Sequence, residues 1–142
     1  MEKTQVSAAF ILIGEDFPID DVTERLGLKP SVSYRRGDRI PNRSSVRFRK
    51  ETCWALETGY EASLDVNIQL HTIINQIQGK ADLIKAIKAE YSLDCKFEIV
   101  IIIEDGDTPA FYLDKEILAF AAGIGTELDV DLYANPYRAD LE

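Results

Sequence analysis

The sequence predicts an α+β fold in which helices pack on one face of a mixed or antiparallel sheet. Two observations lead to this class. Several segments are rich in β-forming residues or alternate in polarity, and four others repeat their apolar residues at helical spacing. The two kinds of segment are interleaved along the chain, which is typical of a layered domain. A length of 142 residues suits one such domain, spanning residues 1–142.

The first half is predicted to hold a central strand, a short helix and an outer strand. Residues 5–13 are apolar on both faces, as expected of a strand in the middle of a sheet. A helix of about nine residues follows from Pro18 and ends at Gly27. A long polar connection over about residues 29–50 contains an extended piece near 31–34, and residues 51–57 return to strand.

The second half is predicted to add two helices, a strand, a short strand, a third helix and a closing strand. Their ranges are 65–78, 81–91, 94–104, 111–113, 115–123 and 126–133. Asp114 is placed to cap the third of these helices. The closing strand alternates cleanly, with Leu128, Val130 and Leu132 expected to face the interior.

The two ends of the chain also resemble each other. Val22-x-x-x-Leu26-Gly27-Leu28 and Leu118-x-x-x-Ala122-Gly123-Ile124 place a glycine at the end of a helix, with a strand close behind. This similarity suggests two related ferredoxin-like βαβ halves.

Several short motifs stand in a fixed order along nearly the whole chain. They are Gly14-Glu15-Asp16-Phe17, Leu26-Gly27-Leu28-Lys29-Pro30, Arg36-Gly37-Asp38 and Cys53-Trp54-Ala55-Leu56, followed near the C-terminus by Glu116-Ile117-Leu118 and Leu128-Asp129-Val130-Asp131-Leu132-Tyr133. As an ordered set they resemble a family of bacterial proteins known as domain of unknown function 4279. The resemblance implies a shared fold unit and no particular activity.

Composition excludes several function classes. A net charge of −9 argues against general nucleic-acid binding, which needs a dense basic footprint. The longest unbroken apolar run, Ile99 to Ile103, is far shorter than a membrane span, and no signal-peptide pattern opens the chain, so we expect a cytoplasmic protein without membrane contact. Cys53 and Cys95 form no disulfide framework and are expected to be small buried residues.

The basic connection is the first candidate site. Residues 35–50 hold seven cations against one aspartate, a net charge of +6, so that the rest of the chain carries −15. Guanidinium groups suit phosphate and carboxylate partners. The segment is therefore an anion- or partner-binding loop, or else a solvated loop or one neutralised by the protein's own acidic surface. The candidate residues are Arg35, Arg36, Arg39, Arg43 and Arg47.

An acidic face on the closing strand is the second candidate site. Glu127, Asp129 and Asp131 all point away from the expected interior. They could dock a basic protein, or they could simply deter edge-to-edge pairing of strands.

Catalytic chemistry is poorly represented. His71 is the only histidine, with no cysteine or carboxylate at metal-ligand spacing from it, and it is expected at the surface or at the boundary of the core. Tyr34 and Phe48 flank the arginines and could stack bases, whereas Trp54 is expected in the core. We therefore expect no catalytic residue, no metal and no cofactor.

Charge and size favour a non-catalytic intracellular interaction protein, of an immunity or regulatory type, whose partner is another protein. A module for a small anionic ligand or nucleotide is the alternative, with Arg35, Arg36 and Arg39 holding phosphate. An enzyme using these arginines comes third. Nucleic acid is not an expected partner, and a homo-oligomer is left open.

Overall fold

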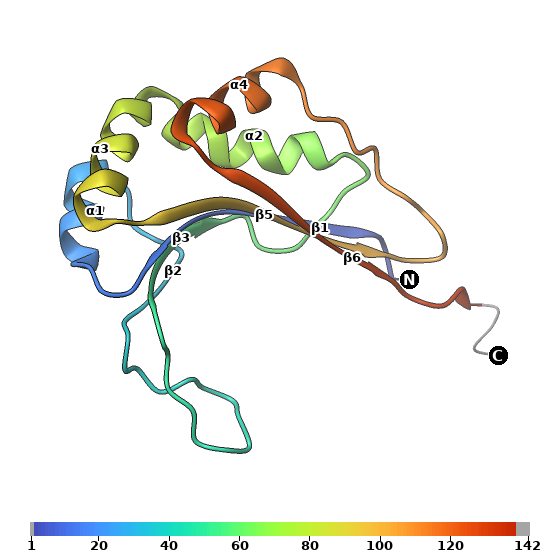
Figure 1. Ribbon diagram of the computed structural model, residues 1–142. Helices are drawn as coiled ribbons and strands as arrows, with labels where there is room; N and C mark the ends of the chain where they lie inside the picture. Colours follow the sequence, from blue (N-terminus) through green and yellow to red (C-terminus); the bar gives the residue numbers. More distant parts are fainter. Residues whose placement is uncertain (1, 139–142) are drawn as a thin grey trace.

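A computed structural model describes residues 2–138 and contains a six-stranded mixed sheet (Figure 1). Five strands follow the order β2-β3-β1-β5-β6, and the short β4 pairs with β1. The strands are β1 (Gln5–Gly14), β2 (Val32–Tyr34), β3 (Thr52–Glu57), β4 (Glu61–Ala62), β5 (Asp94–Ile103) and β6 (Glu127–Ala134).

The first strand organises the sheet. β1 pairs antiparallel with β3 on one side and with β5 on the other, so its backbone is hydrogen-bonded along both edges, as predicted for a central strand. β5 and β6 run parallel, with Phe97 opposite Leu128, and the helix between them makes the crossover that parallel neighbours require.

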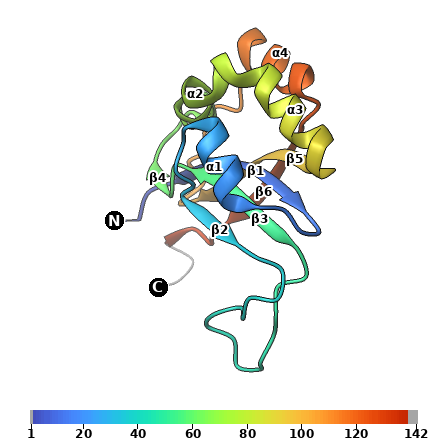
Figure 2. The same cartoon turned by 90° about the vertical axis from the view of Figure 1, so that its left-hand side faces the viewer.

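All the α-helices of the described chain lie on one side of the sheet, as both views show (Figures 1 and 2). They are α1 (Ile19–Leu26), α2 (Val66–Ile77), α3 (Ala81–Tyr91) and α4 (Lys115–Ile124), with a 3₁₀ turn over Gln78–Lys80. The side chain of Asp114 caps α4 by accepting a hydrogen bond from the backbone N–H of Ile117. This bond satisfies one of the free donors at the start of the helix.

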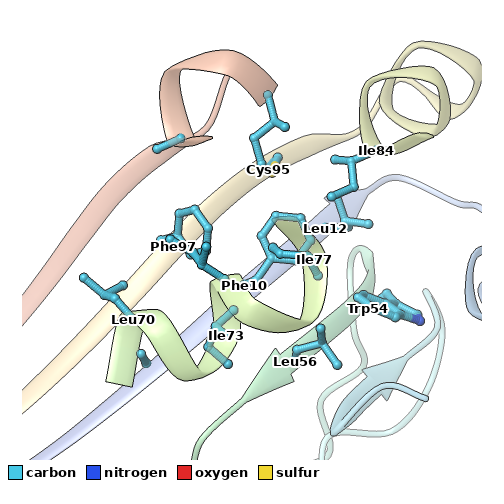
Figure 3. Packing of buried hydrophobic residues seen from close by; sticks show 14 of the residues in the cluster. Phe10, Leu12, Trp54, Leu56, Leu70, Ile73, Ile77, Ile84, Cys95 and Phe97 are labelled. Atoms are coloured by element: carbon cyan, nitrogen blue, oxygen red, sulfur yellow. The ribbon is translucent and has the colours of Figure 1, made fainter. Parts of the chain in front are cut away.

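The core lies between the sheet and this helix layer. Leu70, Ile73 and Ile77 of α2 point toward Phe10 and Phe97 on the two middle strands (Figure 3). The rings of the two phenylalanines lie 5.5 Å apart, a spacing at which aromatic pairs attract.

The only tryptophan of the sequence is fully buried on β3. Its indole Nε1 donates a 3.0 Å hydrogen bond to the hydroxyl of Thr23 in α1. A buried polar group needs such a partner. This bond therefore also fixes α1 against the sheet.

The α+β class, the mixed sheet and the single helix layer are thus confirmed, whereas the two ferredoxin-like halves are not. β5, α4 and β6 form a βαβ unit with adjacent strands. β1, α1 and β2 form one in which β3 lies between the two strands. The two compared glycines are not equivalent either, because Gly27 ends α1 in the left-handed conformation whereas Gly123 lies within α4, which is ended by Gly125.

Three local expectations were wrong. Residues 111–113 are not a strand, and the only pairing there is an isolated bridge between Ala110 and Asp65. The short β4 was not foreseen. Leu132 is exposed because β6 is an edge strand whose end extends beyond the helix layer, although Leu128 and Val130 do pack on the core as expected.

No helix in the part of the chain that the structure describes is long and apolar enough to cross a membrane.

Candidate functional site

The basic connection forms a protruding hairpin rather than an irregular loop. β2 and β3 pair with Tyr34 opposite Cys53, and an isolated bridge further out joins Arg39 to Phe48. Arg39 is five residues after Tyr34 and Phe48 is five residues before Cys53, so the bridge keeps the strand register. Residues 35–50, here called the arm, therefore continue the sheet edge outward, with their tip near Arg43 and Ser44.

The arm is held by its own backbone. Gly37 N–H donates to the carbonyl of Arg49 (2.9 Å), Arg49 N–H donates to the carbonyl of Asp38 (2.7 Å), and Ile40 N–H donates to the carbonyl of Arg47 (2.8 Å). Gly37 adopts a φ of 92°, which favours glycine. Most of its side chains are exposed, including Val46 and Phe48. The arm extends away from the helix layer in both views (Figures 1 and 2).

Two of the predicted site residues are already paired with the protein's own carboxylates. The guanidinium of Arg36 lies 2.7 Å from a carboxylate oxygen of Glu15, and that of Arg35 lies 3.6 Å from one of Asp20. Both carboxylates are near the start of α1. Arg35 and Arg36 thus help to anchor the base of the arm, which weakens their candidacy for an external anion.

A third arginine stacks within the hairpin. The guanidinium carbon of Arg49 lies 3.9 Å from the centre of the Tyr34 ring, a cation–π contact. This contact occupies the ring face of Tyr34, which sequence reasoning had considered for base stacking.

The other cations of the arm stand in solvent. Among residues 2–138, no carboxylate lies within 4.0 Å of the charged nitrogens of Arg39, Arg43, Arg47 or Lys50. These four residues, here called the distal cations, lie on the exposed part of the hairpin. Three of the five predicted arginines are therefore available to an outside partner.

A hollow of about 630 Å³ lies beside the arm and opens to solvent. Its lining combines four cations with two exposed apolar side chains: Arg36, Arg47, Arg49, Lys50, Val46 and Phe48.

The face of the sheet opposite the helices, here called the open face, carries the second predicted site. Glu127, Asp129 and Asp131 of β6 lie opposite Lys96, Glu98 and Val100 of β5, on the side away from the core. Lys96 Nζ is 3.5 Å from both Glu98 and Asp129. Burial alone would lower the pKa of Lys96, but these carboxylates outweigh it and raise the pKa.

Half-buried apolar side chains separate the acidic strand from the arm side of the open face. Cross-strand pairing places Ile11 of β1 between Ala55 and Lys96, and Val100 opposite Asp131. The open face is therefore apolar in its middle and anionic along β6.

One polar pair was missed by sequence reasoning. His71 Nε2 on α2 lies 2.6 Å from Oδ2 of Asp114, the residue that caps α4. The hydrogen bond from His71 is the main cause that lowers the pKa of Asp114, and the bond from Ile117 N–H adds to it. His71 is at the edge of the core, as expected. Its partner Asp114 is 43 residues away in the sequence, so no local sequence pattern indicates the pair.

The described residues offer little for catalysis. No group of three His, Cys, Asp or Glu side chains among them could hold a metal ion. Cys53 and Cys95 are both buried, and burial raises the pKa of each thiol. Neither cysteine therefore has the character of an activated nucleophile.

A family model described as a domain of unknown function (DUF4279) matches residues 4–135. No curated protein matches the chain, and no solved structure matches it either.

Proposed function

We propose that this chain, which belongs to the DUF4279 family, is a non-catalytic protein-binding domain. Its arm recognises a carboxylate-bearing surface of another protein. The distal cations are the observation that carries this proposal. Exposed guanidinium groups that have no internal carboxylate partner can exchange water for the carboxylates of another molecule without losing an ion pair.

Physical cost also favours this use of the arm. The arm carries seven cations and one carboxylate, so its positive charges repel one another. Its exposed apolar side chains, Val46 and Phe48, are also in unfavourable contact with water. A partner that supplies carboxylates at the rim and apolar contacts at the centre would relieve both costs. The net charge of the remaining chain argues against a nucleic-acid partner.

We place this activity in the bacterial cytoplasm, in an immunity-type or regulatory role. The small size and the segregation of charge support that setting.

The test compares two double charge reversals. Arg43→Glu with Arg47→Glu changes the arm, and Lys85→Glu with Lys115→Glu makes the same change in net charge at exposed helix positions. Affinity capture from the native host should yield a bound protein with the wild type and the helix variant but not with the arm variant. Capture that survives the arm reversal would refute the proposal.

A small anionic ligand is the second candidate function, favoured by the hollow beside the arm with its four cations. Nucleotides and sugar phosphates should then raise the melting temperature by mass action. Arg47→Ala should remove that rise, because Arg47 lines the hollow without an internal carboxylate partner among residues 2–138. A melting temperature unchanged by every such compound would rule this candidate out.

A further inference from the structure

We infer that the chain forms a reciprocal dimer in which the arm of each copy docks on the open face of the other. The inference rests on the proposed role of the arm as the recognition element and names a second copy as a partner. It assigns a binding role to the open face as well.

Unmatched charge is the first step of the argument. The distal cations have no carboxylate within 4.0 Å in the described chain. On the open face, Glu127 and Asp131 likewise have no cation within that distance among residues 2–138, since Lys96 pairs only with Glu98 and Asp129. Each copy thus holds both halves of a complementary pair and leaves both unused.

In the described chain the arm forms no hydrogen bond or ion pair with the acidic strand β6 of its own copy. Every hydrogen bond of residues 37–50 stays within the arm, and no ion pair joins these residues to another described part of the chain. The arm leaves the sheet beyond β2 and β3, at the opposite end of the strand order from β6. The distal cations therefore cannot pair with the acidic residues of β6 in the same copy unless the hairpin changes its conformation.

The arm and the open face are both accessible from the side without helices (Figures 1 and 2). A second copy that approaches from that side meets the open face, which is anionic along β6 and apolar in its middle. It presents in turn a cationic arm on which Val46 and Phe48 are exposed. Under two-fold symmetry the contact of arm to face occurs twice, so both copies satisfy both surfaces. Two open faces alone would repel each other, because each is anionic along β6.

A charge-swap experiment tests the dimer. Between two copies of the arm variant, Arg43→Glu with Arg47→Glu, the introduced glutamates meet the acidic residues of β6. Between two copies of the face variant, Glu127→Lys with Asp131→Lys, the introduced lysines meet the cationic arm. Each variant alone should be monomeric. An equimolar mixture should form a heterodimer, because the two glutamates introduced near the tip of one arm then meet the two lysines introduced on the face of the other copy, while the two unchanged surfaces still attract.

Light scattering coupled to size exclusion measures the mass at low salt, where charge attraction is least screened. The wild type should have twice its 16.0 kDa chain mass, and raising the salt from about 0.05 to 0.5 M should weaken the dimer at least about tenfold. Tryptophan emission from Trp54 checks that each variant is folded, and restoration of the dimer by mixing cannot come from misfolded chains.

A monomeric wild type would overturn the inference. So would variants that remain dimeric alone, or a mixture that stays monomeric although both variants are folded. Binding to immobilised poly-glutamate separates this failure from failure of the proposed function. Arm-dependent capture of poly-glutamate by a monomeric wild type would keep the arm as a recognition element and remove only the second copy as its partner.

Discussion

His71 and Asp114 connect two helices that are far apart in sequence, with His71 Nε2 2.6 Å from Oδ2 of Asp114. The other oxygen of the same carboxylate accepts the capping hydrogen bond from Ile117 N–H at 2.9 Å. One side chain therefore both starts α4 and joins it to α2. Its charge state should influence the whole helix layer.

Acid should remove part of the stability of the fold through Asp114. Its pKa is lowered below the ordinary value of 3.8 in the folded protein, so folding favours the ionised form. The resulting stabilisation is fully present above pH 3.8 and is lost as the pH falls through the lowered pKa. Urea unfolding of the wild type and Asp114→Asn should therefore differ at pH 7 and converge in strong acid.

Asn is itself a good capping residue, so Asp114→Asn tests the charge rather than the cap. Asp114→Ala removes both and should be less stable than Asp114→Asn at pH 7. A constant gap between the wild type and Asp114→Asn from pH 7 down to strong acid would show that the charge of Asp114 is not the cause.

Thr23 should matter through its hydroxyl. Thr23→Val keeps the shape of the side chain but leaves the buried indole N–H of Trp54 without its 3.0 Å acceptor, which should cost about 1–3 kcal/mol of unfolding free energy. Thr23→Ser retains a hydroxyl and is the matched control. Equal stability of the valine and serine variants would contradict this role.

Neighbouring residues of β1 should respond differently to truncation. Leu12 faces the core and is fully buried, so Leu12→Ala should cost about 2–5 kcal/mol. Ile11 is on the open face and half-buried, so Ile11→Ala should cost about 1 kcal/mol in the monomer. Denaturant titration of dilute protein measures both, and similar losses would mean that the open face is covered in the monomer.

Glycine should be needed at the end of α1 but not after α2. Gly27 has a φ of 67°, where a Cβ costs roughly 1–2 kcal/mol, so Gly27→Ala should lower the melting temperature. Gly79 has no positive φ and its Cβ would meet open space, so Gly79→Ala should change stability by less than about 1 kcal/mol. Thermal melts of the two variants compare the positions directly.

Both cysteines should be inert in the folded protein. Cys53 and Cys95 are about 5% and 6% exposed, and burial raises the pKa of each thiol. Labelling by a thiol reagent at pH 7.5 should be roughly a hundredfold slower than in denaturant. One thiol reacting at its unfolded rate would show that its strand opens readily.

Sequence patterns predicted most of the fold because burial imposes a period. Phe10 and Leu12 recur at strand spacing and Leu70, Ile73 and Ile77 at helix spacing, and each of these residues is in the core. The edges were less predictable. Leu132 continues the alternation of β6, but nothing in that pattern indicates where the covering helices stop.

The candidate site was predicted in composition but not in shape. The seven cations of the arm are visible in the sequence, whereas the pairing of Arg36 with Glu15 depends on how α1 lies beside the base of the hairpin. The pairing of Arg39 with Phe48 could not be predicted from the sequence, because an exposed polar segment has no alternation of apolar and polar residues. Long-range pairs such as His71 with Asp114 require the tertiary structure.

The hydrogen bonding of residues 37–50, which stays within the arm, has a practical consequence for engineering. Since residues 41–46 complete no part of the core, their side chains can be randomised while the sheet and helices fold as before. A library displayed on this tip would then yield binders of new specificity on an unchanged scaffold. Natural relatives could diversify their targets by the same route, at little cost to folding.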